Sequence, residues 1–270
     1  MDVPPFKSSS VPHFYDDFFV PRLYQPWGEV LVEGVQLGIG ESVLDVACGP
    51  GSLTRICAAH VGPTGRVLGT DQSADMLAVA REKTGIPIAA RIAYKQASAE
   101  ALPAETSGFD AVVCQHGLQF FADRAAALRE MKRVLQPFGR LGVAVWGSLE
   151  QCTQDHALHR AFERAGLGRF CETWRAPFAF SDPAALRHAL EGAGFTEVNV
   201  ETRKRPLRFE GGVRQVVASL YGTLLAEPIY SLQREGRTAL FAAAEQELAP
   251  FLVDGAVVTE MVANLAWARA

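Results

Sequence analysis

The chain has 270 residues, of which 49% are hydrophobic and 21% are charged. This composition supplies a packed core and excludes a wholly disordered protein, and the length predicts one large domain or two modest ones. The 26 basic and 30 acidic residues give a net charge of −4, which disfavours a protein that coats nucleic acid. We find no apolar run of the roughly 18–20 residues that a membrane span needs, and no signal-peptide pattern at the N-terminus. We therefore expect a cytoplasmic protein without a membrane span.

The cysteine and histidine pattern gives no sign of a metal centre. The 5 cysteines are odd in number and widely spaced, so they predict neither a disulfide framework nor a C-x-x-C zinc site. His156 and His159 share one face of a predicted helix, but no carboxylate or cysteine is placed to complete a site with them. We predict no bound metal.

The N-terminal segment, residues 1–40, differs from the rest of the chain. Its first ten residues are polar with two prolines, and we expect them to be disordered or loosely packed. Aromatic residues are frequent from Phe14 to Val35, where we predict helical pieces broken at Pro21 and Pro26.

A regular alternation of short apolar segments and amphipathic segments begins at Glu41. The predicted strands are 42–47, 66–70, 91–96, 109–114 and 141–146. The predicted helices between them are 52–60, 74–83 and 124–135, with Ser73 and Asp123 as N-caps of the last two. Strands that alternate with helices at this spacing predict a parallel sheet in a doubly wound α/β fold, which we assign to residues 41–149.

Residues 150–270 are predicted to complete the sheet and to add a helical cap. We predict helices at 157–165, 182–191, 212–225 and 238–248, and strands near 195–201 and 257–267. The stretches around 150–175 and 212–250 are expected to cover the carboxyl edge of the sheet. The basic run Arg203-Lys204-Arg205, with Arg208, predicts a solvated strand face, and a contact with an acidic substrate is the alternative.

The sharpest motif is a buried strand that runs straight into the turn Cys48-Gly49-Pro50-Gly51. Glycine permits positive φ, and its missing side chain lets a ligand lie against the backbone. Ligands of open α/β sheets bind outside the carboxyl ends of the strands, so this turn predicts a cofactor site.

The residues around the turn narrow the kind of cofactor. No lysine follows as a phosphate-binding loop requires. Thr54 stands where the third glycine of a dinucleotide fingerprint would stand, which weakens a nicotinamide assignment. Asp71 ends the next strand, and its carboxylate can accept both hydroxyls of a ribose. These residues predict a nucleoside ligand without a pyrophosphate.

This combination resembles the class I S-adenosylmethionine-dependent methyltransferases, and more closely the small-molecule branch of the ubiquinone/menaquinone-biosynthesis (type 11) methyltransferases. The motifs that carry the resemblance cover about half of the chain. They are Val43–Gly51, Leu68–Gln72, Gln96–Pro103, Phe109–Phe121 and Arg129–Trp146, with Tyr15, Val20-Pro21 and Pro26-Trp27 in the N-terminal segment. The resemblance implies a Rossmann-like, mostly parallel seven-stranded sheet, an N-terminal lid at residues 1–40 and helical cap insertions.

The resemblance also implies S-adenosyl-L-methionine as cofactor. The residues that it implies for cofactor binding are Tyr15, Asp45, Gly49, Pro50, Gly51, Asp71, Gln72, Met76, Ser98, Ala99 and Gln115. Ser98 stands where relatives carry aspartate at the adenine contact, so we expect somewhat looser binding. The Pro-Gly-Gly turn of relatives reads Pro137-Phe138-Gly139 here, and we expect a type I turn because phenylalanine rarely adopts positive φ.

The acceptor side is less defined by the sequence. His116 follows the fourth predicted strand directly, and it is a tentative general base, a substrate contact or a structural histidine. Gln119, Phe18 and Trp27 are further candidates for substrate contact. The aromatic lid and the apolar cap favour an aromatic or lipophilic acceptor. Cys114-Gln115-His116-Gly117 stands where nucleic-acid amino-methylating enzymes carry an Asn/Asp-Pro-Pro-Tyr-like string, so we expect no nucleic-acid substrate.

We therefore predict methyl transfer to a small, aromatic or lipophilic metabolite at an O, C or N atom. The transfer is an in-line displacement that depends on proximity and orientation. One alternative is a regulatory protein that binds the cofactor without turnover. The other is a nicotinamide-dependent oxidoreductase, whose third glycine and catalytic residues are not evident. A homodimer is left open.

Overall fold

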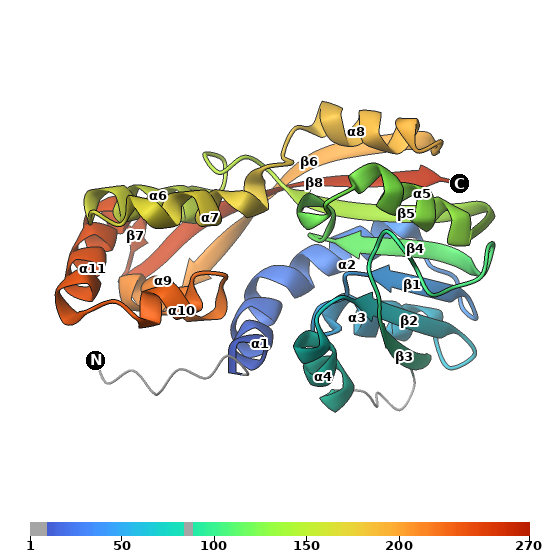
Figure 1. The fold of residues 1–270 in the computed structure, drawn as a ribbon, viewed down its shortest axis with the longest axis horizontal. Coiled ribbons are helices and arrows are strands. Elements are labelled where there is room, and N and C mark those ends of the chain that lie inside the picture. Colours follow the sequence, from blue (N-terminus) through green and yellow to red (C-terminus); the bar gives the residue numbers. More distant parts are fainter. Residues whose placement is uncertain (1–9, 84–88) are drawn as a thin grey trace.

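The computed structural model describes residues 10–83 and 89–270, so residues 1–9, for which we predict loose packing, lie outside the described part. The strands are β1 (Ser42–Val46), β2 (Arg66–Asp71), β3 (Arg91–Gln96), β4 (Phe109–Gln115), β5 (Leu135–Trp146), β6 (Thr196–Phe209), β7 (Leu252–Val253) and β8 (Ala256–Arg269). They form one sheet with the order β3-β2-β1-β4-β5-β8-β6, and the two-residue β7 pairs with β8 off this path (Figure 1). β1 to β5 pair in parallel, and β8 runs antiparallel to β5 and β6.

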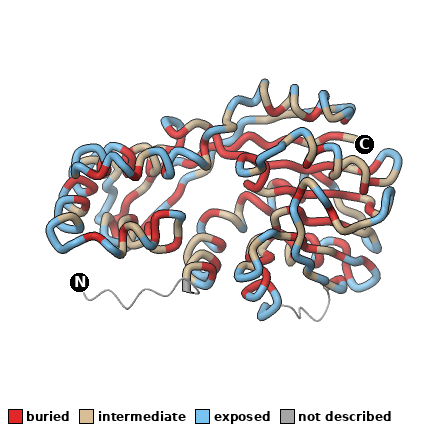
Figure 2. The backbone as a smooth tube through the Cα atoms, viewed as in Figure 1, coloured by how far each residue is buried: buried red, intermediate tan, exposed pale blue. Residues whose placement is uncertain are grey.

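Helices cover both faces of this sheet, as the doubly wound prediction requires. The helices are α3 (Ser52–Val61), α4 (Ala74–Glu82), α5 (Arg124–Val134) and α8 (Pro183–Gly192). Val43 of β1 packs in one apolar cluster with α3, while Leu44 and Val46 pack in a second cluster with α5 and α8. Because β1 and β4 are buried on both faces, their sequences read as continuous apolar runs. Figure 2 shows the buried residues concentrated along the strands.

The N-terminal segment is helical from its first described residue to Val35. It consists of α1 (Ser10–Phe14), the π-helical η1 (Tyr15–Tyr24) and α2 (Gln25–Val35). The predicted break at Pro21 is wrong, because Pro21 lies inside η1. Pro26 lies in the first turn of α2, which follows η1 directly, so the chain stays helical where the break at Pro26 was predicted.

The C-terminal half adds a second group of helices beside the sheet. These are α6 (Thr153–Arg164), α7 (Cys171–Arg175), α9 (Gly212–Ser219), α10 (Ala226–Tyr230) and α11 (Arg234–Leu248). Figure 1 shows that β6 and β8 continue beyond their sheet neighbours and carry this group. β6 extends to Phe209, well past the predicted end at Glu201, because its later residues pair with Val257 to Ala263 of β8.

Two local findings complete the comparison with the sequence. Arg203, Lys204 and Arg208 of the basic run are exposed side chains of β6, and Arg203 pairs with Glu201 at 2.7 Å and Arg208 with Glu210 at 2.7 Å. Phe138 has φ +64°, so the expected type I turn is wrong, and the conformation is the one that a type II turn needs at this position.

Among the described residues, 10–83 and 89–270, we find no helix with the length and apolar character of a membrane span.

Candidate functional site

A cavity of about 910 Å³ opens where the carboxyl ends of β1, β2 and β4 face η1, α6 and α7. Its wall combines segments from the N-terminal, central and C-terminal parts of the chain. Nine residues that the sequence predicts for the site line it. They are Tyr15, Gly49, Asp71, Gln72, Met76, Ser98, Ala99, Gln115 and His116.

The glycine turn after β1 forms one side of this cavity. Gly49 has φ +53°, and a Cβ atom added to it would meet no atom within 4 Å. The backbone at Gly49 is therefore open to a ligand, as the motif predicts. Gly51 has φ +78° and packs against the Tyr94 side chain, so it shapes the turn without lining the cavity.

Asp71 joins the turn to the next strand. Its Oδ2 accepts a hydrogen bond from the Gly49 N–H at 2.9 Å, and its Oδ1 accepts one from the Ser73 N–H at 2.8 Å. A carboxylate has about four acceptor positions, so both oxygens keep one for a ligand hydroxyl. Ser98 donates to Glu100 and retains acceptor capacity of its own. This wall fits the predicted nucleoside.

Asp45 lies below the turn and is 1% exposed. Its Oδ2 accepts from the Thr54 hydroxyl at 2.6 Å, and burial raises the pKa of the carboxyl to about 7. Thr54, at the third position of the dinucleotide fingerprint, therefore ties α3 to β1. Asp45 does not line the cavity, and neither does Pro50.

His116 and Trp146 form a flat aromatic wall. Their ring centroids are 3.5 Å apart with an interplanar angle of 10°, and Tyr24 approaches His116 edge-on at 5.9 Å. Both ring nitrogens of His116 are buried and have no hydrogen-bond partner among the described residues. Burial lowers the pKa of His116 to about 3, so its ring is neutral at pH 7 and offers one donor and one acceptor.

The N-terminal helix is fixed to this wall. Gln115 donates through Nε2 to the Tyr24 carbonyl at 2.7 Å, and Tyr24 stacks on Tyr15 with centroids 4.8 Å apart. Burial raises the pKa of Tyr24 to about 12 and that of Tyr15 well above its usual range, so both phenols are neutral.

Three predicted acceptor contacts do not line the cavity. Trp27 is 1% exposed and packs edge-on against Trp146, with ring centroids 6.2 Å apart. Phe18 stacks on Phe14 at 5.2 Å, and Gln119 is buried. We therefore assign Trp27 and Phe18 to packing, and Gln119 is not retained as an acceptor contact.

The cavity also contains polar residues that the sequence reading missed. They are Gln154 and Asp155 at the start of α6, Thr173 in α7, and Ser219 and Thr223 near η5. The only local signal for this part of the site in the sequence was Asp155, which stands just before the helix predicted at 157–165. Their position in the site depends on pairing between β5, β6 and β8, which no local pattern reveals.

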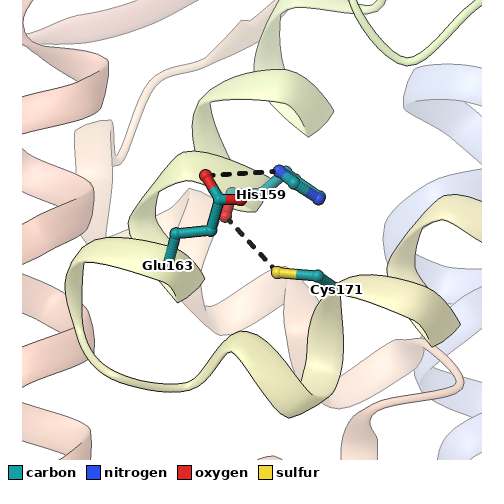
Figure 3. Close-up of side chains that lie close together, drawn as sticks. All are labelled: His159, Glu163 and Cys171. Carbon is teal, nitrogen blue, oxygen red and sulfur yellow. Dashed lines mark hydrogen bonds and ion pairs between the residues drawn. The ribbon is translucent and has the colours of Figure 1, made fainter.

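Figure 3 shows His159 and Glu163 of α6 close to Cys171, the first residue of α7. The sequence argument found no carboxylate or cysteine to complete a site with His156 and His159. Glu163 and Cys171 do lie near His159, but His156 is not part of this cluster. His159 Nε2 accepts from Arg175 Nε at 2.9 Å, so the proton of the neutral ring is on Nδ1, which faces Glu163 at 3.9 Å. A metal ion would have to displace this proton and lie beside a guanidinium group. We assign the cluster to linking the two helices, and the absence of a metal stays a prediction.

Relatives with known names match the chain. A family model described as "Methyltransferase domain" matches residues 44–143. The 2-phytyl-1,4-naphtoquinone methyltransferase of Thermosynechococcus vestitus is 33% identical over 186 residues, which cover 65% of this chain and 81% of that protein. The ubiquinone/menaquinone biosynthesis C-methyltransferase of Klebsiella pneumoniae is 40% identical over 120 residues, or 44% of this chain. The match spans 48% of that second relative, about half its length.

Solved structures share the fold. A putative methyltransferase from Bacillus halodurans has a TM-score of 0.58 and 23% identity, and the match covers 90% of this chain and 97% of that one. Phosphoethanolamine N-methyltransferase 2 from Haemonchus contortus, in complex with S-adenosylhomocysteine, has a TM-score of 0.61 and 17% identity, covering 97% of this chain and 58% of that one. With its motifs, sheet order and relatives in agreement, the chain belongs to the class I S-adenosylmethionine-dependent methyltransferases, in their small-molecule (type 11) branch.

Proposed function

We propose that this methyltransferase acts on a quinol-type aromatic acceptor that lies against His116 and Trp146. This proposal rests on the stacked pair of rings in the cavity wall, in which both imidazole nitrogens lack a hydrogen-bond partner among residues 10–83 and 89–270. An aromatic acceptor can pack against this pair of rings, and a hydroxyl group that approaches in the plane of the imidazole can pair with one of its nitrogens. The names of the two relatives, which refer to naphthoquinone and to ubiquinone and menaquinone, support the same class.

The cofactor would occupy the side of the cavity formed by the glycine turn. Gly49 leaves room along its backbone, Asp71 has acceptor positions for the ribose hydroxyls, and Met76 and Ala99 offer an apolar surface to the base. Tyr15 and Gln115 line the cavity where this side meets the aromatic wall. When bound, S-adenosylmethionine supplies an already activated methyl group.

The protein's part is then to hold the acceptor in line and to exclude water. His116 is suited to orient an acceptor hydroxyl, because its neutral ring can donate and accept. Its lowered pKa makes it a weak base at pH 7, so of the open roles for His116 we retain substrate contact. The cytoplasmic location, the absence of a nucleic-acid partner and a homodimer stay predictions from the sequence.

A methyl-transfer assay tests this function. The purified protein, labelled S-adenosylmethionine and a reduced 2-alkyl-1,4-naphthoquinone should give a methylated product, detected by mass spectrometry. His116→Ala should raise the acceptor KM about tenfold, the equivalent of one hydrogen bond, without changing cofactor affinity. His188→Ala, an exposed histidine on α8, is the matched control.

Two results would oppose the proposal. If S-adenosylhomocysteine binds but no quinol is methylated, the acceptor class is wrong, and a protein that binds the cofactor without turnover becomes the better account. If quinols are methylated equally well by the His116→Ala variant, the acceptor does not lie on the aromatic wall.

A further inference from the structure

Asp155 has a carboxyl group in the cavity wall that no described side chain pairs with. It lies in the first turn of α6 and lines the same cavity as His116, Tyr24 and Trp146. Its main-chain carbonyl accepts a hydrogen bond from Trp174 Nε1 at 2.8 Å, which anchors this turn to α7. The side chain is therefore presented from a fixed backbone.

No described side chain forms a hydrogen bond or ion pair with the Asp155 carboxyl, which is helped only by its own backbone N–H. The titratable groups within electrostatic reach are Tyr24 and Cys152, and both are neutral at pH 7. The elements that pack on α6 contribute the uncharged Trp174 and Met261 to the cavity wall. Withdrawal from bulk water raises the pKa of Asp155 to about 7. Asp155 is half-buried, so its carboxyl is open to the cavity and can accept a hydrogen bond from a ligand there.

We propose that Asp155 is a catalytic residue whose carboxylate takes the proton that the acceptor loses when it gains a methyl group. This inference rests on the proposed function, because a quinol exchanges one proton for one methyl group. The new bond from the acceptor to the methyl carbon forms as the bond from that carbon to sulfur breaks. The positive charge lost from sulfur leaves as the proton, which passes from the acceptor to Asp155 and then to solvent. No oxidant or reductant is needed.

The other titratable groups along the cavity are less suited to this role. A general base works best when its pKa lies near the working pH. Burial holds the pKa of His116 at about 3 and raises the pKa of Tyr24 to about 12. Asp71 already accepts from two backbone N–H groups, and the Ser98 hydroxyl lowers the pKa of Glu100. Among the described residues of the cavity wall, Asp155 combines an unused carboxyl with a pKa near neutrality.

The test compares wild type with Asp155→Asn, which keeps the size of the side chain and removes the base. The wild-type kcat should rise with pH to a plateau above about pH 7. Asp155→Asn should lower kcat about 100- to 10,000-fold and remove this rise, while the calorimetric affinity for S-adenosylhomocysteine stays unchanged. Asp254→Asn, in the exposed turn between β7 and β8, is the matched control and should behave as wild type.

A second readout separates proton transfer from a structural role. Fluorinated naphthoquinols ionise more readily, so the defect of the Asp155→Asn variant should shrink with the more acidic acceptor. If this variant binds cofactor poorly, Asp155→Glu provides the same comparison, because it keeps a carboxyl and should retain a pH-dependent kcat.

The outcomes are distinct. If the Asp155→Asn variant keeps kcat within threefold and the same pH profile, this inference fails and the proposed function stands. If only KM rises, Asp155 binds the acceptor and is no base. If amines are methylated in place of quinols, Asp155 binds a cation and is no base. If wild type binds S-adenosylhomocysteine but methylates no quinol, the proposed acceptor class fails, and this inference fails with it.

Discussion

Ala47 shows how closely single residues fit around the cavity. It adopts φ +58° although it is not a glycine, and it lines the cavity beside the glycine turn. A Cβ atom on Gly117 would come within 2.6 Å of the Ala47 Cβ. The turns after β1 and β4 therefore fit together only while one of these positions lacks a side chain. The sequence gives no sign of this, because alanine carries no signal for a left-handed backbone and the contact joins residues far apart in the chain.

This contact predicts coupling between the two positions. Gly117→Ala should lower the free energy of unfolding by about 1–3 kcal/mol, because a methyl group is forced into a filled space. Ala47→Gly in the same background should recover most of this loss, since it removes both the clash and the strained alanine. Urea denaturation of the four variants of the cycle measures the coupling. Strictly additive effects would show that the two turns do not touch in this way.

At the scale of elements, local signals and long-range pairing contribute differently. The predicted N-caps are confirmed: Ser73 accepts from the Met76 N–H and Asp123 from the Ala126 N–H. The strands of the parallel half were predicted within a residue or two, except β5, which begins at Leu135 instead of 141. The apolar runs of β1 and β4 mark strands that are buried on both faces. The end of β6 was missed because exposed arginines and Pro206 mask a strand that pairing with β8 stabilises. The helix η1 continues through Pro21 because tertiary contacts stabilise it. One set of these contacts joins Asp16 of η1 to Arg55 and Lys83.

Asp16 ties η1 to the cofactor half of the molecule. It is 3% exposed, lies 3.6 Å from Arg55 of α3 and forms an ion pair with Lys83. Asp16→Ala should lower the free energy of unfolding by about 1.5–3 kcal/mol and speed hydrogen exchange in η1, because Arg55 loses this acidic partner and Lys83 loses one of its two. Asp17→Ala is the matched control: Asp17 is exposed, and its ion pair with Lys83 is worth about 1 kcal/mol or less. Equal effects of the two variants would show that Asp16 does not hold the helix.

At the scale of the whole molecule, the cavity has two sides of different origin. The glycine turn and Asp71 lie within the region that the family model matches, and their short motifs made the cofactor side predictable. Tyr24, Trp146, Asp155 and Trp174 form the other side, and they come from η1, β5, α6 and α7. No short motif joins them. His116 on this side was a candidate from the sequence, whereas Trp146 and Asp155, which we propose to contact the acceptor and to take its proton, became visible only through the fold.

The most direct test of this account is calorimetric titration of the protein with S-adenosylhomocysteine. We predict saturable binding that Asp71→Ala weakens about ten- to a hundredfold, because the ribose hydroxyls and the glycine turn both lose a charged acceptor. Asp75→Ala, an exposed carboxylate of the same segment, should leave the affinity unchanged. No heat with this ligand, together with saturable heat from a nicotinamide dinucleotide, would contradict the account.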